Sequence, residues 1–354
     1  MKKFLAITMS LVLSVALLSS CSGSGNGSGG ASSTPSGSAS TSGESAYQEM
    51  TLKLACDGMA ETAIDMYTAV RFAECVSEMT DGAITIEIFG SNQLSGGNQQ
   101  KAIEMLTQGT TELAVYSNSI AGGVLDERIL AASIPFAFSS YDEVVEIYNT
   151  TGGAFVNEAL APHNVTYLGM VHNGFRNISN NKNPIATPDD MKNLKIRVMS
   201  SEMYLDIFRT LGADPIAMSI SELYTALQQG TVDGQDNGFT QAYGHKTYEV
   251  QNYYTRINYC YDSFMIFGNS DKLAALPQNV QDVLQAAATE ACEKTRTWFV
   301  ESEEEYVQLF QDSGVEVLEL TEAQKEPFKQ LLAPVIEKYK AQYGAEACAA
   351  FGIA

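Results

Sequence analysis

Short segments of the chain alternate hydrophobic and polar residues, and longer segments repeat hydrophobic residues every three or four positions. The segment LKIRV (194–198) has the two-residue period of a β-strand. Its hydrophobic residues predict one buried face, so the face that carries Lys195 and Arg197 is expected to point toward water or a cleft. The pattern raises the question of what Arg197 contacts.

The same periodicities predict alternating strands and helices from about residue 50 onward. The expected strands cover 50–55, 83–89 and 112–116, and the expected helices cover 61–80 and 98–109. A strand, a helix and a second strand in succession form a βαβ unit, which implies a parallel sheet with a right-handed crossover.

A second copy of this arrangement follows later in the chain. Its expected elements are a strand at 195–199, a helix at 201–212, a short strand at 213–218 and a helix at 221–230. Gly212 occupies the position where glycine commonly ends a helix, and Ser219 and Glu222 have the spacing of a capping box. In both copies a helix ends in QGT before an acidic residue, at 105–112 and at 226–233. We therefore expect two lobes of related topology.

The C-terminal third of the chain is predicted to be helical. The segment 279–314 contains no glycine or proline before Gly314. At 1.5 Å per residue such a helix reaches about 50 Å, which is too long for one lobe. We expect it to run across both lobes.

The first residues have the features of an export signal. A basic start, MKKF, precedes the uncharged apolar stretch 5–18, and small residues follow up to Cys21. The sequence Leu18-Ser19-Ser20-Cys21 resembles the lipobox of bacterial lipoproteins, in which the cysteine is diacylated and becomes the first residue. We expect a signal peptide at 1–20 and a lipid on Cys21. A plain signal peptide is the alternative, and the stretch is short for a membrane span.

The charge of the remaining chain excludes some partners. Residues 22–46 are almost entirely Ser, Gly, Thr and Ala, which is typical of a flexible tether. Removing Lys2 and Lys3 lowers the 21 basic residues to 19, which against 42 acidic residues gives a formal charge of −23. Such a charge repels nucleic acid and anionic head groups, so no nucleic-acid partner is expected.

Cysteine usage does not indicate a metal site. The cysteines beyond Cys21 lack CxxC spacing; they are Cys56, Cys75, Cys260, Cys292 and Cys348. We expect most of them to be small buried hydrophobic residues. One disulfide among them is the alternative, if the compartment is oxidising.

The segment 173–239 contains a series of distinctive motifs. They are the pair FR at 175–176, D-x-K-x-L-K-I-R-V at 190–198, LGA-x-P at 211–215, E-L-Y-T-A-L at 222–227 and V-D-G-Q-D-N at 232–237. In these motifs the segment resembles the solute-binding subunit of tripartite ATP-independent periplasmic (TRAP) transporters. Weaker similarity covers the rest of the mature chain, including SNQLSGG at 91–97. The motif order and spacing agree throughout.

The resemblance implies an α/β, two-lobe fold of the periplasmic-binding-protein type II kind, with a long helix spanning both lobes. Ligands of open α/β sheets bind beyond the carboxyl ends of the strands, hence between the two lobes. The expected organisation is a signal peptide at 1–20, a lipidated cysteine and linker at 21–46, lobe I at 47–173 plus about 263–302, and lobe II at 174–262 plus about 303–354.

The resemblance also suggests what Arg197 contacts. In this family an arginine at the position of Arg197 forms a bidentate pair with the ligand carboxylate. The chemistry suits the task, because a guanidinium offers two parallel donors and stays charged when it is desolvated. Arg176 matches a second family arginine that often contacts the ligand, and the alternative is an ion pair that stabilises its lobe. Asn237 matches a family amide at the end of the D-G-Q-x-N loop, and the alternative is a simple turn residue.

Further candidates follow the ends of other predicted strands. Asp57 follows the first strand and Ser117 and Asn118 follow the third, although all three suit turns or helix starts equally well. Ile220 stands where some family members have an aromatic residue on the ligand. Gly96, Gly97 and Asn98 replace charged residues that are frequent in their loop. Specificity therefore cannot be copied from the family.

Catalytic signatures such as HExxH, G-x-S-x-G and a P-loop do not occur. We expect no enzymatic activity, no cofactor and no metal. The resemblance implies an extracytoplasmic, lipid-anchored monomer that captures a small carboxylate and delivers it to TRAP membrane subunits. A sensor or an enzyme on the same fold is the alternative.

The predicted ligand is a sugar acid. The polar candidates, together with Ser200, suit sugar hydroxyls, and no obvious second basic pair awaits another carboxylate. This favours a uronate or an aldonate over a C4-dicarboxylate. Arg176 is the main argument for the dicarboxylate, because it is able to hold a second carboxyl group.

Overall fold

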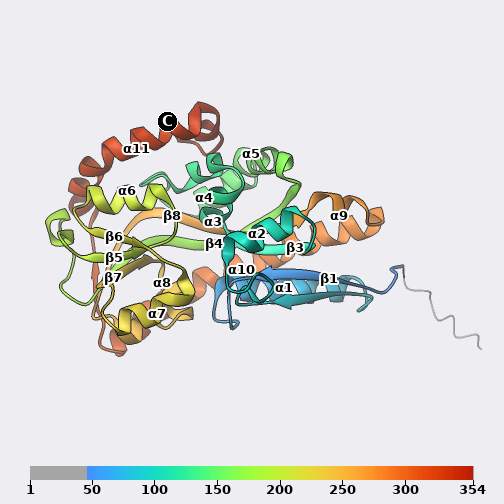
Figure 1. Cartoon of the computed structure of the whole chain (residues 1–354), viewed down its shortest axis with the longest axis horizontal. Coiled ribbons are helices and arrows are strands. Elements are labelled where there is room, and N and C mark those ends of the chain that lie inside the picture. Colours follow the sequence, from blue (N-terminus) through green and yellow to red (C-terminus); the bar gives the residue numbers. More distant parts are fainter. Residues whose placement is uncertain (1–45, 354) are drawn as a thin grey trace, which may run out of the picture. The chain divides into compact units, whose positions relative to one another are not determined.

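The computed structural model describes residues 46–353, and its strands form one nine-stranded mixed sheet (Figure 1). The strand order is β2-β1-β3-β8-β4-β7-β5-β6, with β9 beside β8. The strands are β1 (Met50–Cys56), β2 (Ile84–Phe89), β3 (Leu113–Ser117), β4 (Val165–Asn180), β5 (Lys195–Val198), β6 (Asp214–Ala217), β7 (Gly234–Asn237), β8 (Tyr253–Asn269) and β9 (Glu316–Glu319).

Helices cover both faces of this sheet. The α-helices are α1 (Ile64–Met79), α2 (Gln99–Thr107), α3 (Asn118–Val124), α4 (Tyr141–Tyr148), α5 (Thr151–Leu160), α6 (Glu202–Thr210), α7 (Ile220–Gln228), α8 (Phe239–Gly244), α9 (Ser270–Ala274), α10 (Gln278–Asp312) and α11 (Glu322–Ala350). Short 3-10 helices are η1 (Gln93–Ser95), η2 (Glu127–Ser133), η3 (Ala161–His163), η4 (Pro188–Met191) and η5 (Thr247–Val250).

The two ends of the sheet have the same topology, as the repeated pattern predicts. At one end β1 pairs in parallel with β2 and β3, and at the other end β5 pairs in parallel with β6 and β7. In each copy the first strand lies in the middle. The QGT segments are also equivalent, because Gly109 and Gly230 both follow the second helix with φ +69°, a backbone conformation that glycine adopts without steric cost.

Two long antiparallel strands join the ends of the sheet. β4 and β8 pair with each other over most of their length, and β8 then pairs with β3 while β4 pairs with β7. Their pairing is interrupted by register shifts between Tyr167 and Gly169, between His172 and Gly174 and between Arg176 and Ile178. Both strands are buried on both faces through their middle, so they lack the alternation by which strands are recognised in a sequence.

The long helix predicted at 279–314 is confirmed as α10, with 35 residues. It packs against α1 at one end of the sheet and against α8 and β9 at the other. The last helix, α11, contacts both α5 and α6 in the same way. These two helices and the paired strands β4 and β8 connect the two halves.

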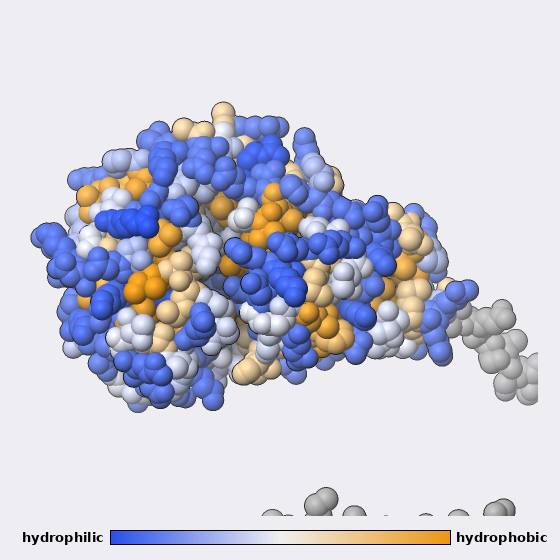
Figure 2. All heavy atoms as spheres, viewed as in Figure 1, coloured by the Kyte–Doolittle hydropathy of each residue, from blue (hydrophilic) through white to orange (hydrophobic). Residues whose placement is uncertain are grey.

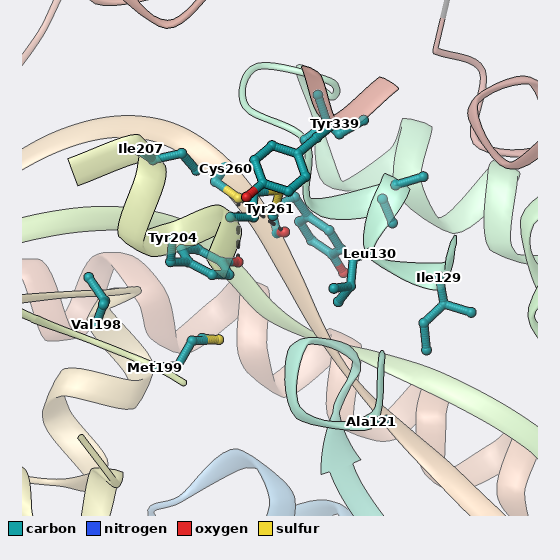
Figure 3. Packing of buried hydrophobic residues seen from close by; sticks show 14 of the residues in the cluster. Ala121, Ile129, Leu130, Val198, Met199, Tyr204, Ile207, Cys260, Tyr261 and Tyr339 are labelled. Atoms are coloured by element: carbon teal, nitrogen blue, oxygen red, sulfur yellow. Dashed lines mark hydrogen bonds between the residues drawn. The ribbon is translucent and has the colours of Figure 1, made fainter. Parts of the chain in front are cut away.

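The largest hydrophobic cluster draws its side chains from both halves (Figure 3). Ala121, Ile129 and Leu130 come from the first half, and Val198 and Tyr204 come from the second. Between them, β8 and α11 contribute Cys260, Tyr261 and Tyr339. The Tyr204 hydroxyl lies 3.5 Å from Cys260 Sγ. The halves therefore share a core near the site described below.

Some details differ from the sequence predictions. The first helix begins at Ile64 instead of residue 61, since residues 57–63 form a loop. Ser219 precedes α7 but makes no capping bond, because its hydroxyl lies 2.9 Å from the Ser221 hydroxyl. Gly212 ends α6 with φ +87°, as expected.

All five described cysteines are buried free thiols, so residues 46–353 contain no disulfide. The predicted signal peptide, Cys21 and the linker lie outside the described residues. Within the described part of the chain, none of the helices combines the length and apolarity of a membrane span. On the face shown in Figure 2, hydrophobic residues form small patches separated by hydrophilic ones.

Candidate functional site

A cavity lies where the carboxyl ends of strands from both halves face each other. The space among its lining atoms is about 410 Å³, a figure that includes part of its mouth, which is open to solvent. Its walls are formed by Asp57, Gln99, Tyr116, Ser117, Ile120, Asn173, Arg176, Arg197, Met199, Ile220, Asn237, Gln241, Asp262 and Phe264. The location agrees with the expectation for an open α/β sheet. Of the predicted residues, the structure brings together Arg197, Arg176, Asn237, Asp57 and Ser117.

Arg197 is a buried guanidinium with few partners. It extends from β5 and is 3% exposed, and its Nε donates to the Met218 carbonyl oxygen over 2.9 Å. Among residues 46–353 it forms no ion pair, and that carbonyl is its one hydrogen-bond acceptor. Burial lowers the pKa of Arg197 to about 10. The charges of Asp236 and Asp57 oppose this fall in the pKa, although neither carboxylate forms an ion pair with Arg197. A buried cation without a direct ion pair is costly, and an anion in the cavity would lower that cost.

Arg176, on β4, is surrounded by acceptors. Its Nε donates to Asp236 Oδ2 over 2.7 Å, its Nη2 to the Asp236 carbonyl oxygen over 2.7 Å, and its Nη1 to Asp262 Oδ2 over 3.2 Å. The guanidinium also lies over the Tyr204 ring, 5.1 Å from the centroid. Arg176 is 1% exposed, so these ion pairs are almost dry. Arg176 thus lines the cavity but is already paired within the chain.

Asp57 begins the loop after β1 and faces the same cavity. The Gln99 side-chain amide donates to its Oδ2 over 2.6 Å, and the Asn92 amide donates to its Oδ1. Burial raises the pKa of Asp57, while these two bonds and the charge of Arg197 oppose the rise. Its backbone N–H donates to the buried Asp65 carboxylate over 2.9 Å, which fixes the loop.

Asn237 and Ser117 sit at two other strand ends. Asn237 ends β7 and donates from its side-chain amide to Gln235 Oε1 over 3.0 Å, and its carbonyl oxygen accepts from the Tyr254 hydroxyl over 2.7 Å. Ser117 ends β3, and its hydroxyl oxygen accepts from the Ile120 N–H, so it caps α3. Both residues are nearly buried on the cavity wall.

Asn118 and Ser200 lie elsewhere. Asn118 is fully buried, and its side-chain amide donates to the Ser133 hydroxyl over 3.2 Å. It is not part of the cavity wall. Ser200 is exposed and lines a neighbouring hollow with Gln99, Ile120 and Ser219. The alternating pattern of a strand does not predict which of the residues at its end faces the cavity. Of Ser117 and Asn118, Ser117 lines the cavity.

The sequence analysis missed several polar wall residues. Asn173 and Asp262 lie on β4 and β8, the two long strands that lacked a strand pattern, and Gln241 lies on α8. Asn173 precedes Arg176 by three positions within the recognised segment, and this proximity is the one signal that could have indicated it. Asp262 reaches the site only because β8 crosses the sheet beside β4.

The described residues around the cavity do not form a metal centre. Within residues 46–353 no group of three or more His, Cys, Asp or Glu side chains is placed to hold a metal ion. Two histidines are buried or partly buried, and burial lowers their pKa, to about 3 for His172 and to about 4 for His245. The cavity wall is thus largely polar and contains a cation, Arg197, that forms no ion pair with a described residue.

Comparison with protein families and known proteins gives a consistent result. The model of the family described as bacterial extracellular solute-binding protein, family 7 (DctP), matches residues 58–342. The C4-dicarboxylate-binding periplasmic protein DctP of Rhodobacter capsulatus is 30% identical over 285 residues, which cover 80% of this chain and 84% of that protein.

Solved structures show the same fold. The sugar acid binding protein DctPAm of Advenella mimigardefordensis, in complex with galactonate, has a TM-score of 0.80 at 28% identity and covers 86% of this chain and 97% of its own. A TRAP periplasmic solute-binding protein of Shewanella oneidensis with bound succinate has a TM-score of 0.80 at 26% identity, covering 86% and 98%.

Proposed function

The chain belongs to family 7 of the bacterial extracellular solute-binding proteins, and on that basis we propose how its cavity works. It is a TRAP solute receptor for a small organic acid. The observation that carries the proposal is Arg197, a buried guanidinium that forms no ion pair among the described residues. Both of its terminal nitrogens are available for the two oxygens of a ligand carboxylate. Asn237 and Ser117 supply further polar contacts on the same wall.

The ligand is a sugar acid, a uronate or an aldonate. Amides, hydroxyls and the carboxylates of Asp57 and Asp262 line the cavity beside Arg197, and such groups match the hydroxyls of a sugar acid. Arg176 is committed to Asp236 and Asp262, which reduces the case for a second ligand carboxylate. The galactonate complex of a structural neighbour supports the choice. The relative named for C4-dicarboxylates and the neighbour with succinate support the alternative.

Binding leads to delivery. Asp57 and Ser117 belong to one half of the sheet, while Arg197 and Asn237 belong to the other, so a ligand that contacts both sets favours the closed arrangement. The closed receptor passes its ligand to TRAP membrane subunits and does not transform it. A lipid on Cys21 holds the monomer at the outer side of the cell membrane, and the segment 22–46 acts as its tether.

A ligand screen tests the proposal. Sugar acids, C4-dicarboxylates, keto acids and aromatic acids are compared by thermal shift, because a ligand at 100 times its Kd stabilises the fold by about 2.7 kcal/mol. We expect the largest shift with a sugar acid and a much smaller shift in Arg197→Ala. The control is Arg209→Ala, which removes an exposed arginine paired with Glu202 and Asp206. A shift of undiminished size in Arg197→Ala would contradict the proposed site.

Turnover is tested separately. Incubating the protein with the binding acid and analysing the solution by mass spectrometry should recover the acid unchanged. Formation of a product would favour the alternative of an enzyme on this fold.

A further inference from the structure

A buried oxygen on the cavity wall lacks a hydrogen-bond donor. Asn173 is 4% exposed, and its Nδ2 donates to Asp262 Oδ2 over 2.7 Å. Since a carboxylate only accepts, this bond fixes the orientation of the amide and leaves Oδ1 on its other side. Asn173 Oδ1 is buried and has no partner among the described residues, and the same is true of Gln241 Oε1 on the same wall. Unpaired buried acceptors call for a donor from the ligand.

Asp57 is a third acceptor, and it is held rigidly. The Asn92 amide that donates to Asp57 is itself oriented by the Tyr116 hydroxyl, which donates to Asn92 Oδ1 over 2.6 Å. Gln99 fixes the other carboxylate oxygen. Asp57 forms no ion pair with any described residue, and a carboxylate has more acceptor positions than these two amides use. The remaining positions are therefore free for a donor in the cavity.

The charges around the cavity add up to a negative balance. Arg176 is matched by two acids, Asp236 and Asp262, and Arg197 is the remaining cation beside Asp57. These groups carry a net charge of −1 when all are ionised. One ligand carboxylate is compensated locally by Arg197. A second carboxylate would find no free cation in this wall and would be repelled by Asp57.

We propose that Asp57, Asn173 and Gln241 form an acceptor subsite that selects monocarboxylates bearing hydrogen-bond donors and rejects dicarboxylates. The inference rests on the proposed function and assigns its specificity to named residues. Sugar hydroxyls are the donors to which the subsite is matched. Asp57 is the residue that excludes a second carboxylate, by charge.

The test compares ligands that differ by one group. Galactonate and galactarate share a carbon skeleton, and galactarate has a second carboxylate in place of the terminal hydroxymethyl group. Calorimetry on the unaltered protein should give galactonate an affinity about tenfold or more above that of galactarate. Succinate should also bind more weakly than galactonate. Equal or tighter binding of either dicarboxylate would overturn the inference without any substitution.

The substitution Asp57→Asn sharpens the test. Asparagine keeps the shape of the side chain and one acceptor oxygen but removes the charge. The ratio of the affinity for galactonate to the affinity for galactarate should therefore fall about tenfold, mainly because galactarate binds more tightly. The matched control is Glu87→Gln, on the exposed positions of β2, which should leave the ratio unchanged. Circular dichroism and thermal unfolding check that both variants fold. An unchanged ratio in folded Asp57→Asn would overturn the role of Asp57.

Further outcomes separate the inference from the proposed function. If acids bind through Arg197 but dicarboxylates bind best, the receptor stands and the subsite fails. If the free amino acid serine binds and galactonate does not, the acceptor subsite is supported, with the ligand's ammonium group as its donor. The choice of a sugar acid as the ligand is then wrong. If no carboxylate binds, both fail together.

Discussion

The two arginines of the cavity wall differ in what surrounds them. Arg176, on the long crossing strand β4, donates to Asp236 and Asp262 and lies over the Tyr204 ring. Arg197, on the short strand β5, is also buried but donates only to the Met218 carbonyl oxygen within the described chain. The sequence gives little sign of this difference, because both lie in segments of the same family resemblance.

The difference teaches how to distinguish a structural charge from a functional one. A buried ion pair that is complete within the chain contributes to the fold. Removing one partner leaves the other charges buried without a counter-ion. A buried charge without its counter-ion raises the free energy of the empty protein, and the ligand supplies what is missing. Substitutions of the two arginines should therefore affect different measurements.

The largest effect is expected for stability in Arg176→Met. This change leaves Asp236 and Asp262 as buried carboxylates without their cation, which costs about 3–5 kcal/mol. Denaturant unfolding without ligand should show the loss. Arg197→Met is the matched variant and should lose little stability or gain some, because it removes a desolvated charge. Equal destabilisation by the two substitutions would break the comparison.

The next effect concerns affinity. Arg197→Ala should weaken binding of the best acid by about 2–5 kcal/mol, or roughly 30- to 4,000-fold. Arg197→Lys should recover part of this loss, because an ammonium keeps the charge but not the two parallel donors. Calorimetry on folded variants measures both. Unchanged affinity in Arg197→Ala would show that the carboxylate binds elsewhere.

A buried side chain that avoids charge altogether sharpens the comparison further. His172 is 1% exposed, lies 2.8 Å from the Tyr261 hydroxyl through Nδ1, and has its pKa lowered to about 3 by burial and then by Arg296. The folded state thus keeps it neutral, while the unfolded chain takes up a proton below pH 6.5. Its stabilising contribution is present above pH 6.5 and is lost at about 1.4 kcal/mol per pH unit as the pH falls toward 3.

The variant His172→Gln measures this contribution. The unfolding free energy of both proteins is measured from pH 7 to pH 5. It should decline less steeply with falling pH in the variant than in the unaltered protein. The variant His163→Gln, in the short 3-10 helix η3, is the matched control for replacing a histidine by glutamine. Parallel curves for His172→Gln would show that His172 is protonated in the fold as well.

The smallest effect is expected for Asn237→Ala. Asn237 lines the wall beside the arginines but already donates to Gln235 Oε1. Losing one neutral hydrogen bond to the ligand should weaken binding by about 0.5–1.5 kcal/mol. Calorimetry beside Arg197→Ala ranks the two contributions. An equal loss in both variants would mean that the amide and the guanidinium act as one unit.

Periodicity and the family motifs predicted much of this molecule. The repeated strand and helix pattern predicted two parallel units, and both exist with the same strand order. The absence of glycine and proline predicted α10. The position of Arg197 on an alternating strand indicated a side chain directed toward a cleft, and it lines the cavity. These features are local, because each depends on the residues within a few turns or strand positions.

Other features were decided only by the tertiary structure. β4 and β8 are buried on both faces and so carry no alternating pattern, yet they bring Asn173, Arg176 and Asp262 to one wall. Asp236 becomes the partner of Arg176 because β7 pairs with β4 across 60 sequence positions. The sequence determined which residues could act as anion partners. Only the fold decided which guanidinium was left without one, because a buried charge is satisfied or not by side chains that are distant in sequence.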